Sequence, residues 1–313
     1  MKGSVRCGVV GVGSLGLHHA RLYSQLDGCE LVGVLDSDMA RASEVAALYN
    51  CQAFETLDEI AANCDCVSVV TPTDKHAQVA LPLLEKNVHL LVEKPMCFSL
   101  SDAERMCKEA EARSLILQVG HVEHYNPVMN FLEKVVNAPR FIATQRLAPF
   151  TPRGTDVSVV LDLMIHDIGI MMQLIKSEVI HMEAVGMRVL SNGEDIANAR
   201  LHFKSGCIAD IGASRISEKK VREIRVFQED AYLSLDFMNQ RGHLIKPADK
   251  IFRKLEIPIA KEEPLRVELL SFLNCVRSNS LPKVDAKFGK ETLKIALKIE
   301  KILKKNSKNL PTN

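Results

Sequence analysis

The sequence has almost no net charge. Its 40 lysine and arginine residues are balanced by 39 aspartate and glutamate residues, which leaves a formal charge of +1. A domain that binds DNA or RNA usually presents an excess of basic residues. The composition therefore argues against nucleic acid as a partner. The locally basic stretch 298–308 is explained more simply by the solvated face of a helix and a tail.

Long hydrophobic runs are missing as well. No apolar stretch reaches the roughly 20 residues of a membrane span, and Met1–Ser4 leads into a strand-like run without the features of a secretory signal. The nine cysteines are an odd number, and Cys64-x-Cys66 has no second pair at zinc spacing. We expect a cytoplasmic protein with reduced thiols, without membrane contact and without a metal.

What is present fits a folded protein of two domains. The chain has 313 residues, of which 47% are hydrophobic and 25% charged. These values are typical of soluble globular domains with full cores. The sequence contains neither an internal repeat nor a low-complexity linker.

Strands and helices are expected to alternate in the first 120 residues. The expected strands are Cys7–Val12, Glu30–Leu35, Cys66–Val70, His89–Val92 and Leu115–Val119, and the expected helices are Leu15–Leu26, Ser37–Leu48, one around Val79–Leu84 and one that ends at Arg113. Ser99 or Ser101 would cap the last of these, with Glu104 completing a capping box on Ser101. Such alternation predicts a parallel sheet with helices on both faces.

The pattern changes after Asn126. One helix is expected over Val157–Ile175, and short strands then follow one another from Val179 to Ile257. Strands without intervening helices indicate an antiparallel or mixed sheet. Two helices, Pro264–Ser278 and Lys287–Lys304, close the chain. We expect domains at 1–122 and 123–313, with the last helix able to pack back on the first domain.

A glycine motif follows the first expected strand. Gly11, Gly13 and Gly16 stand between a strand and a helix, as a dinucleotide-binding loop requires. Gly11 permits the tight turn, Gly13 lets a pyrophosphate approach the backbone, and Gly16 lets the helix pack on the strand. Ser14 and Leu15 begin the helix whose N–H groups would face the phosphates.

An acidic residue lies where the adenosine ribose is expected. Asp36 follows Gly16 by 20 residues and comes directly after the second expected strand. A carboxylate there hydrogen-bonds the ribose hydroxyls and repels a 2′-phosphate, so NAD is favoured over NADP. Arg41 is close enough in sequence to soften that preference. A glycine-rich turn with a surface aspartate is the less favoured alternative.

Polar residues also follow further strands of the expected parallel sheet, and such sheets bind ligands at the carboxyl ends of their strands. Thr71, Pro72 and His76 could line the nicotinamide ribose, although a helix-entry turn explains His76 nearly as well. Glu93 and Lys94 follow the next strand. A lysine at this place could hold or move the proton of a substrate hydroxyl. The alternative is an exposed lysine in an ordinary loop.

Asp162 and His166 are four residues apart in a helix-like run, so they share one face. Apolar residues surround them, and ionisable groups in such a segment are costly unless they have partners or a task. His166 could serve as a general base, while Asp162 could orient it or bind a hydroxyl. A buried structural Asp–His pair is the alternative. A metal site with Asp167 would lack a third nitrogen or sulfur ligand.

These motifs resemble the glucose–fructose oxidoreductase/inositol dehydrogenase family, often called Gfo/Idh/MocA. The resemblance covers essentially the whole chain and rests on the glycine loop, the Glu-Lys-Pro at 93–95 and the Asp-x-x-x-His at 162–166. It implies that Lys94, Asp162 and His166 form the catalytic set. It also implies a Rossmann domain followed by an open-faced mixed sheet, a face that often serves for oligomerisation.

Two segments are similar to a subgroup of this family. Val119–Pro127 and Asp162–Ile168 resemble stretches of UDP-N-acetylglucosamine 3-dehydrogenases and related sugar-nucleotide oxidoreductases. The resemblance implies substrate contacts from His121 and Asn126. His124 replaces an arginine of the subgroup pattern, which puts one polar contact in doubt. Arg153 could offer another cation to a diphosphate.

We therefore expect an α/β protein with an N-terminal Rossmann domain and a C-terminal α+β domain that carries an open-faced, mostly antiparallel sheet. The expected activity is NAD-dependent oxidation of a ring hydroxyl of a sugar nucleotide, UDP-N-acetylglucosamine at C3, whose keto product would feed an aminotransferase, as for an amide-linked lipid A. A free polyol or monosaccharide is an alternative substrate. A non-catalytic NAD(H)-binding sensor or scaffold is an alternative function. A homodimer or homotetramer through the C-terminal sheet is implied by the resemblance.

Overall fold

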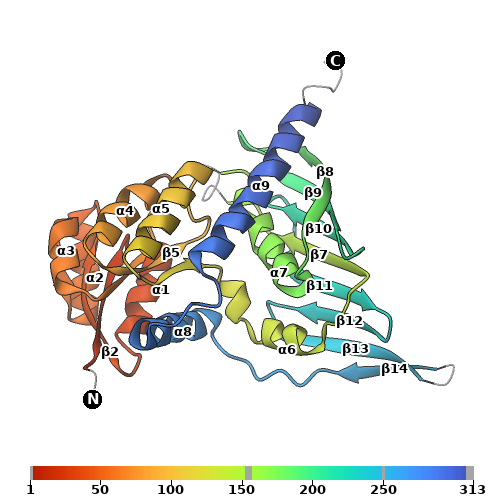
Figure 1. Ribbon diagram of the computed structural model, residues 1–313, viewed down its shortest axis with the longest axis horizontal. Helices are drawn as coiled ribbons and strands as arrows, with labels where there is room; N and C mark the ends of the chain where they lie inside the picture. Colours follow the sequence, from red (N-terminus) through yellow and green to blue (C-terminus); the bar gives the residue numbers. More distant parts are fainter. Residues whose placement is uncertain (1–2, 152–156, 249–250, 308–313) are drawn as a thin grey trace. The chain divides into compact units, whose positions relative to one another are not determined.

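The computed structural model describes residues 3–151, 157–248 and 251–307. The chain divides into two compact units (Figure 1). Unit 1 contains Met1–Val122 and Glu263–Glu291, and unit 2 contains Glu123–Glu262 and Thr292–Asn313. The structure therefore groups Glu263–Glu291 with unit 1, whereas the sequence analysis placed all of 123–313 in the second domain.

Unit 1 is built on a six-stranded parallel sheet with the strand order β3-β2-β1-β4-β5-β6. The strands are β1 (Val5–Val10), β2 (Cys29–Leu35), β3 (Gln52–Ala53), β4 (Cys66–Val69), β5 (His89–Glu93) and β6 (Leu117–Gly120). The order reverses between β1 and β4, and at such a switch point the carboxyl ends of the strands open a crevice for a ligand. The short strand β3 was not expected from the sequence.

Helices connect these strands. They are α1 (Ser14–Tyr23), α2 (Met39–Tyr49), α3 (Leu57–Asn63), α4 (His76–Glu85) and α5 (Leu100–Ala112), with a 3₁₀ turn at Thr73–Lys75 before α4 and α8 (Pro264–Ser278) from the C-terminal part of the chain. Helix α3 was missed from the sequence. The cap of α5 is Ser99, whose Oγ accepts a hydrogen bond of 3.0 Å from Asp102 N. The expected capping box on Ser101 and Glu104 was therefore wrong.

One apolar core lies under the sheet of unit 1. Val9 and Val34 of the sheet belong to the same buried cluster as Leu269, Phe272 and Leu273 of α8. Burial of such side chains removes apolar surface from water and is the main stabilising term of the fold. Helix α8 is thus an integral layer of unit 1.

Unit 2 is built on an eight-stranded sheet with the order β14-β13-β12-β11-β7-β10-β9-β8. The strands are β7 (Phe141–Leu147), β8 (Val179–Met187), β9 (Ile196–Phe203), β10 (Ile208–Ser214), β11 (Val221–Gln228), β12 (Ala231–Asp236), β13 (Arg241–Ala248) and β14 (Ile251–Glu256). The β7–β10 pair is parallel and the other neighbours are antiparallel. The expected mostly antiparallel sheet is confirmed, although β7 itself was missed.

The segment expected as one helix over Val157–Ile175 has two parts. A π-helical turn, Val160–Met164, comes first, and α7 (Ile165–Ile175) follows it. Hydrophobic periodicity does not reveal the wider hydrogen-bond spacing of a π turn, which is often found at functional sites. A 3₁₀ turn at Val122–Tyr125 and the helices α6 (Pro127–Val135) and α9 (Ala286–Ser307) complete the elements. Helix α9 crosses from unit 1 to unit 2 after Glu291.

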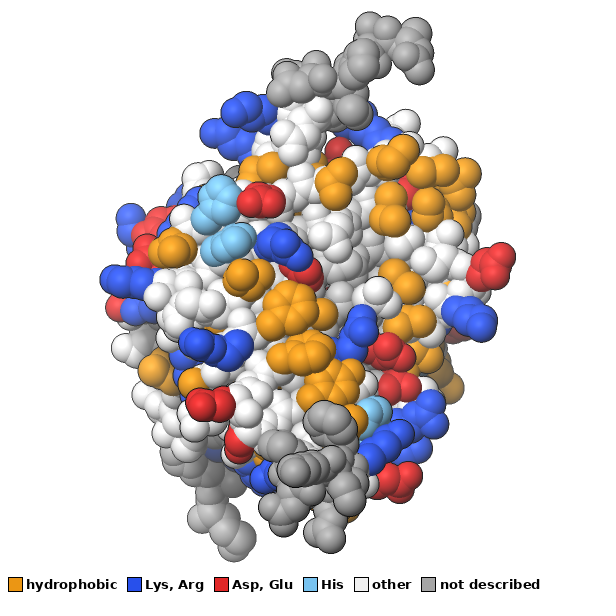
Figure 2. Space-filling view, turned by 90° about the vertical axis from the view of Figure 1, so that its right-hand side faces the viewer, with side chains coloured by type: hydrophobic (Ala, Val, Ile, Leu, Met, Phe, Trp, Pro, Cys, Tyr) orange, Lys and Arg blue, Asp and Glu red, His pale blue; other side chains and the backbone are white. Residues whose placement is uncertain are grey.

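The sheet of unit 2 has one buried and one open face. Side chains alternate between buried and exposed along β9 and β7, as in a sheet that is covered on one side only. The rings of Phe141, Phe227, Tyr232 and His243 form a row across neighbouring strands on the open face, with centroids 4.7–6.4 Å apart. Figure 2 looks onto the side where these strands lie and shows hydrophobic side chains gathered in bands.

Candidate active site

The glycine loop has the geometry of a phosphate cradle. Gly11 has φ +87°, and a Cβ there would lie 2.8 Å from backbone atoms of Val70 and Thr71, so only glycine fits. A Cβ on Gly16 would collide with the carbonyl oxygen of Gly11. A Cβ on Gly13, by contrast, would meet nothing within 4 Å. The loop therefore leaves open space directly over the backbone of Gly13.

Helix α1 begins at this open space. Gly13 is its N-cap, and no side chain caps the helix. Ser14 is exposed and Leu15 is half-buried. The first N–H groups of a helix and its positive dipole end attract a phosphate. The cradle and the uncapped helix end together fit the pyrophosphate of a dinucleotide.

Asp36 is held directly beside the glycine loop. Its Oδ2 accepts a hydrogen bond of 2.7 Å from Val12 N, and its Oδ1 accepts one of 3.0 Å from Asp38 N. Arg41 approaches the same loop, because its Nε donates to the carbonyl oxygen of Val12 at 3.1 Å. The Arg41 guanidinium also pairs with Glu44 at 2.6 Å. The carboxylate is thus fixed at the end of β2, and the neighbouring cation is already engaged.

The side chain of His76 connects two loops by hydrogen bonding. Its ring is buried, with Nε2 2.9 Å from the carbonyl oxygen of Thr71 and Nδ1 3.0 Å from that of Pro95. Burial lowers the pKa of this histidine, so the neutral ring donates to one of the two carbonyls. His76 therefore joins the loop after β4 to the turn that contains Lys94. Any effect of His76 on a cofactor would therefore pass through the backbone of Thr71.

Lys94 stands at the end of β5 in a polar neighbourhood. It is half-buried, and its backbone N–H donates to Glu93 Oε2 at 3.3 Å. The buried Glu93 carboxylate also contacts His19 Nε2 at 3.2 Å. His121, which follows β6, is buried as well. Its burial, together with the positive charge of Lys94, lowers its pKa to about 4, so its ring is neutral at neutral pH.

A second buried carboxyl group belongs to this neighbourhood. Glu268 of α8 is completely buried, and within the described part of the chain neither of its side-chain oxygens has a hydrogen-bond partner. Burial and the nearby charge of Glu93 raise the pKa of Glu268 well above its ordinary value. Burial therefore favours the protonated, uncharged form of Glu268 more than in an exposed glutamate. The sequence analysis did not single it out.

Asp162 and His166 lie in consecutive turns of unit 2. Asp162 is in the π-helical turn and half-buried, and His166 is in the first turn of α7 and buried. The backbone N–H of Asp162 donates to the carbonyl oxygen of Ser158 at 3.0 Å. Arg215, which follows β10, lies 4.0 Å from Asp162 Oδ2 and donates to the carbonyl oxygen of Val157 at 2.8 Å. A buried cation thus accompanies the candidate catalytic aspartate.

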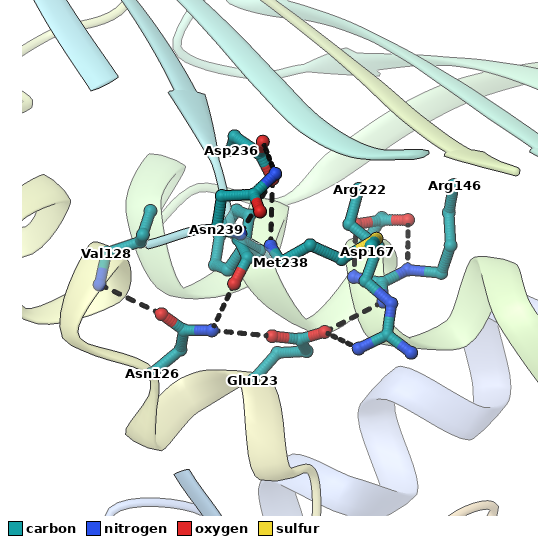
Figure 3. Close-up of polar contacts among 10 residues, drawn as sticks. Glu123, Asn126, Val128, Arg146, Asp167, Arg222, Asp236, Met238 and Asn239 are labelled. Atoms are coloured by element: carbon teal, nitrogen blue, oxygen red, sulfur yellow. Dashed lines mark hydrogen bonds and ion pairs between the residues drawn. The ribbon is translucent and has the colours of Figure 1, made fainter. Parts of the chain in front are cut away.

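Asn126 is engaged by its own surroundings (Figure 3). Its Oδ1 accepts from Val128 N at 3.1 Å, which caps α6, and its Nδ2 donates to Glu123 Oε2 at 3.2 Å and to the carbonyl oxygen of Phe237 at 3.0 Å. Both N–H bonds of the amide are used. Asn126 therefore shapes the segment after His121, and its effect on a substrate would be indirect.

The structure gathers the expected residues in two groups. Those at the carboxyl ends of the parallel strands of unit 1 are Gly11, Gly13, Ser14, Leu15, Gly16, Asp36, Arg41, Thr71, Pro72, His76, Glu93, Lys94 and His121. Asn126, Asp162 and His166 belong to unit 2. Arg153 lies outside the described residues.

Some residues of these neighbourhoods were missed. His19, Arg146, Arg215 and Glu268 are all buried polar residues. Glu268 could have been found, because it stands between Leu265 and Leu269 on the apolar face of a helix. A charge on such a face is unusual unless it has a task.

The residues of unit 1 fit a nicotinamide dinucleotide. The open cradle at Gly13 suits the pyrophosphate, and the fixed carboxylate of Asp36 suits the adenosine ribose. In the described ranges, no three histidine, cysteine, aspartate or glutamate residues form a group suited to a metal ion. None of the described helices is long and apolar enough to cross a membrane.

Comparison with known proteins agrees with this geometry. Residues 5–121 match the model of an oxidoreductase family with an NAD-binding Rossmann fold, and residues 139–234 match the model of the GFO/IDH/MocA C-terminal domain. The chain is 35% identical to the UDP-N-acetylglucosamine 3-dehydrogenase of Acidithiobacillus ferrooxidans over 302 residues, which cover 94% of this chain and 96% of that protein.

The crystal structure of that Acidithiobacillus enzyme superposes with a TM-score of 0.92, over 96% of this chain and 98% of that one. The chain is also 26% identical to the scyllo-inositol 2-dehydrogenase (NAD(+)) of Bacillus subtilis, over 91% of this chain and 90% of that protein. The two domain models and the relative at 35% identity over nearly the whole chain all point to the same family. The chain therefore belongs to the GFO/IDH/MocA family of NAD-binding oxidoreductases.

Proposed function

We propose that the protein oxidises the C3 hydroxyl of UDP-N-acetylglucosamine, with NAD as hydride acceptor. The observation that carries this proposal is the 35% identity to a UDP-N-acetylglucosamine 3-dehydrogenase over 94% of this chain. The inositol dehydrogenase of Bacillus subtilis matches over a similar length at 26%. The difference in identity favours the sugar nucleotide over a free polyol.

Proton transfer is assigned to Lys94, Asp162 and His166. NAD, when bound, supplies the acceptor for the hydride that leaves the sugar carbon. Lys94 or His166 takes the proton of the hydroxyl, since a lysine or histidine with access to a substrate can act as a general base. Asp162 orients the histidine or holds a hydroxyl, and Arg215 accompanies its carboxylate at 4.0 Å.

Asp36 gives the site its preference for NAD. Its carboxylate is fixed by Val12 and Asp38, and in that place it would accept hydrogen bonds from the ribose and repel the 2′-phosphate of NADP. Arg41 is engaged by Glu44 and by the carbonyl oxygen of Val12, so it offers NADP only limited compensation.

Two of the expected substrate contacts belong to the described residues. His121 is neutral and buried close to the charge of Lys94, which suits a hydrogen bond to an uncharged sugar hydroxyl or amide. Asn126 acts indirectly, by holding the segment that follows His121. Arg153 remains our candidate for a cation that meets the diphosphate.

The assembly and the biological context are also proposals. The open face of the unit 2 sheet, with the row from Phe141 to His243, supports a homodimer or homotetramer through that sheet. A 3-keto sugar nucleotide is a substrate for an aminotransferase. We therefore propose a place in the cytoplasm, in the supply of a 3-amino sugar such as that of an amide-linked lipid A.

The experiment is a comparison of substrates with the purified protein and NAD. NADH is followed by its absorbance with UDP-N-acetylglucosamine, UDP-glucose, free N-acetylglucosamine and myo-inositol. We expect the highest kcat/KM for UDP-N-acetylglucosamine. The site of oxidation is tested with substrate deuterated at C3 or at C4. Only the C3 label should pass to the cofactor.

The outcomes separate the candidates. A higher kcat/KM for free inositol would move the protein to the polyol dehydrogenases of the same family. Transfer of the C4 label would retain the sugar nucleotide and change the reacting carbon. Tight binding of NADH without turnover on any sugar would favour the sensor.

A further inference from the structure

Four charged side chains from four elements meet in unit 2, three of them in its interior (Figure 3). Arg146 of β7 donates from Nε and Nη2 to the two carboxylate oxygens of Asp167 on α7, at 2.9 and 3.0 Å. Its Nη1 donates to Glu123 Oε1 at 2.9 Å, and Arg222 Nη1 of β11 donates to the same oxygen at 3.1 Å. The side chains of Arg146, Glu123 and Asp167 are almost completely buried.

The pairing of two strands explains why a carboxylate is needed at Glu123. Arg146 and Arg222 are direct cross-strand partners in the β7–β11 pair. Like charges in directly opposite positions repel each other. One oxygen of Glu123 accepts from both guanidinium groups and removes this repulsion. With Asp167 included, the cluster holds two arginines and two acidic residues, of which only Arg222 is partly exposed.

Arg146 makes contact through all three nitrogens of its guanidinium. Each of its three nitrogens donates to a carboxylate, and the pair to Asp167 has the parallel two-bond geometry that fixes an angle as well as a distance. A lysine would supply the charge at one point and could not hold both oxygens of Asp167. The arrangement therefore depends on arginine in particular.

Asp167 directly follows His166 in the first turn of α7. Neighbouring side chains of an α-helix point about 100° apart. A carboxylate held by two parallel hydrogen bonds from one guanidinium therefore sets the rotation of this turn about the helix axis, and with it the direction of His166. Apolar packing alone is non-directional, and the π turn just before α7 interrupts the regular hydrogen-bond ladder.

Stability is a weak reason to keep such a cluster. Two charges that lose their water gain little net free energy, and an apolar pair of similar volume is often as stable or more so. Geometric specificity is the role that remains. We propose that Arg146 is a positioning residue, which directs His166 through its two-bond contact with Asp167. This inference rests on the proposed role of His166 in proton transfer.

The main test is the double variant Arg146→Met/Asp167→Leu. It removes one positive and one negative charge, so Glu123 keeps Arg222 as its partner and no charge is left unpaired in the interior. We expect normal folding by circular dichroism and thermal unfolding, an unchanged Kd for NADH, and a kcat lowered about 10- to 100-fold, as a misplaced catalytic group produces. Arg146→Lys should not restore kcat.

The control is a matched pair on the same sheet. Arg200 of β9 and Asp210 of β10 also form a two-bond contact, at 2.6 and 2.7 Å, but on the exposed side. Arg200→Met/Asp210→Leu should leave kcat unchanged. When His166 is already replaced by alanine, Arg146→Met/Asp167→Leu should lower kcat no further. The reason is that two changes that act through the same residue do not add.

A readout without turnover keeps this inference separate from the proposed function. The imidazole NMR signals of His166, assigned by their loss in His166→Ala, should move in Arg146→Met/Asp167→Leu and stay in place in the control pair. Three results would each overturn the inference. They are unmoved NMR signals, an unchanged kcat in Arg146→Met/Asp167→Leu, and a full further fall in kcat when this change is added to His166→Ala. If the unmodified protein oxidises no sugar while the signals move, the proposed function fails and the positioning role stands.

Discussion

Asp36 accepts a hydrogen bond of 2.7 Å from the backbone N–H of Val12, between two glycines of the phosphate loop. The same carboxylate therefore holds the loop and would face the adenosine ribose. Under the proposed function, the fold would link the shape of the cradle to its selectivity for NAD. A change at Asp36 should therefore affect both the shape of the loop and the selectivity for the cofactor.

The first prediction concerns this carboxylate. Asp36→Asn removes its negative charge with little change in shape, so the repulsion of a 2′-phosphate is lost. We expect the ratio of the NADPH and NADH dissociation constants to fall about tenfold or more, as loss of a hydrogen bond to a charged group implies. Fluorescence titration of both cofactors measures it. Glu85→Gln, at an exposed position of α4, is the control for a general charge effect. Equal affinity for both cofactors in the unmodified protein would remove the role of Asp36.

The second prediction concerns Lys94. Lys94→Met should lower kcat by about 10²- to 10⁴-fold, the usual contribution of a general acid or base, while the Kd for NADH changes little. Lys75→Met is the matched control, because Lys75 is an exposed lysine in the loop after the neighbouring strand β4. Steady-state rates and NADH titration distinguish the two effects. Near-normal turnover in Lys94→Met would make Lys94 a structural residue.

The third prediction uses the buried acid Glu268. Its pKa in the folded protein is raised well above the ordinary value of 4.5 by burial and by Glu93. The unfolded chain therefore releases this proton first, and stability falls as the pH rises from about 4.5 through the folded-state pKa. Glu268→Gln cannot ionise. Its gain in melting temperature over the unmodified protein should increase with pH, whereas Glu85→Gln at an exposed position should show no trend. A constant difference across pH 5–9 would mean that Glu268 does not titrate in this window.

The fourth prediction concerns His121, for which stability changes with pH in the opposite direction. The pKa of His121 is lowered from 6.5 to about 4 by burial and by Lys94. The unfolded chain binds this proton more readily, so the stability present above pH 6.5 is lost as the pH falls towards 4. The shift corresponds to at most about 3 kcal/mol. In urea unfolding at pH 7 and pH 4.5, His121→Gln should lose less stability between the two than the unmodified protein. An equal loss of stability between pH 7 and pH 4.5 in His121→Gln and in the unmodified protein would contradict the assignment. His18→Gln, at an exposed position of α1, is the control.

The sequence was sufficient for the parallel sheet and its glycine loop. The expected strands of the first 120 residues overlap β1, β2, β4, β5 and β6. Short apolar runs bounded by glycine, proline and aspartate are strong signals, because the local residue preferences and the buried position agree. Asp36 could be placed for the same reason, since its distance from the glycine motif is set by one strand–helix–strand unit.

Strand β7 could not be recognised in the same way. Its buried positions alternate regularly, but they hold Ile142, Thr144 and Arg146. An analysis that equates charge with exposure cannot count Arg146 as buried. Its partners Glu123 and Asp167 are distant in sequence, and only the fold brings them together. The residues hardest to predict are thus those whose burial depends on a partner in another element.

Helix α8 shares one core with the strand that precedes the glycine loop, through Leu269, Phe272 and Leu273. A ribosome releases β1 to β6 first and must then synthesise the whole sheet of unit 2 before α8 emerges. Until that moment the nascent unit 1 leaves apolar surface uncovered, a state that invites aggregation or chaperone binding. Translation arrested between Gly120 and Phe272 would release a chain with a complete dinucleotide motif in an unfinished core.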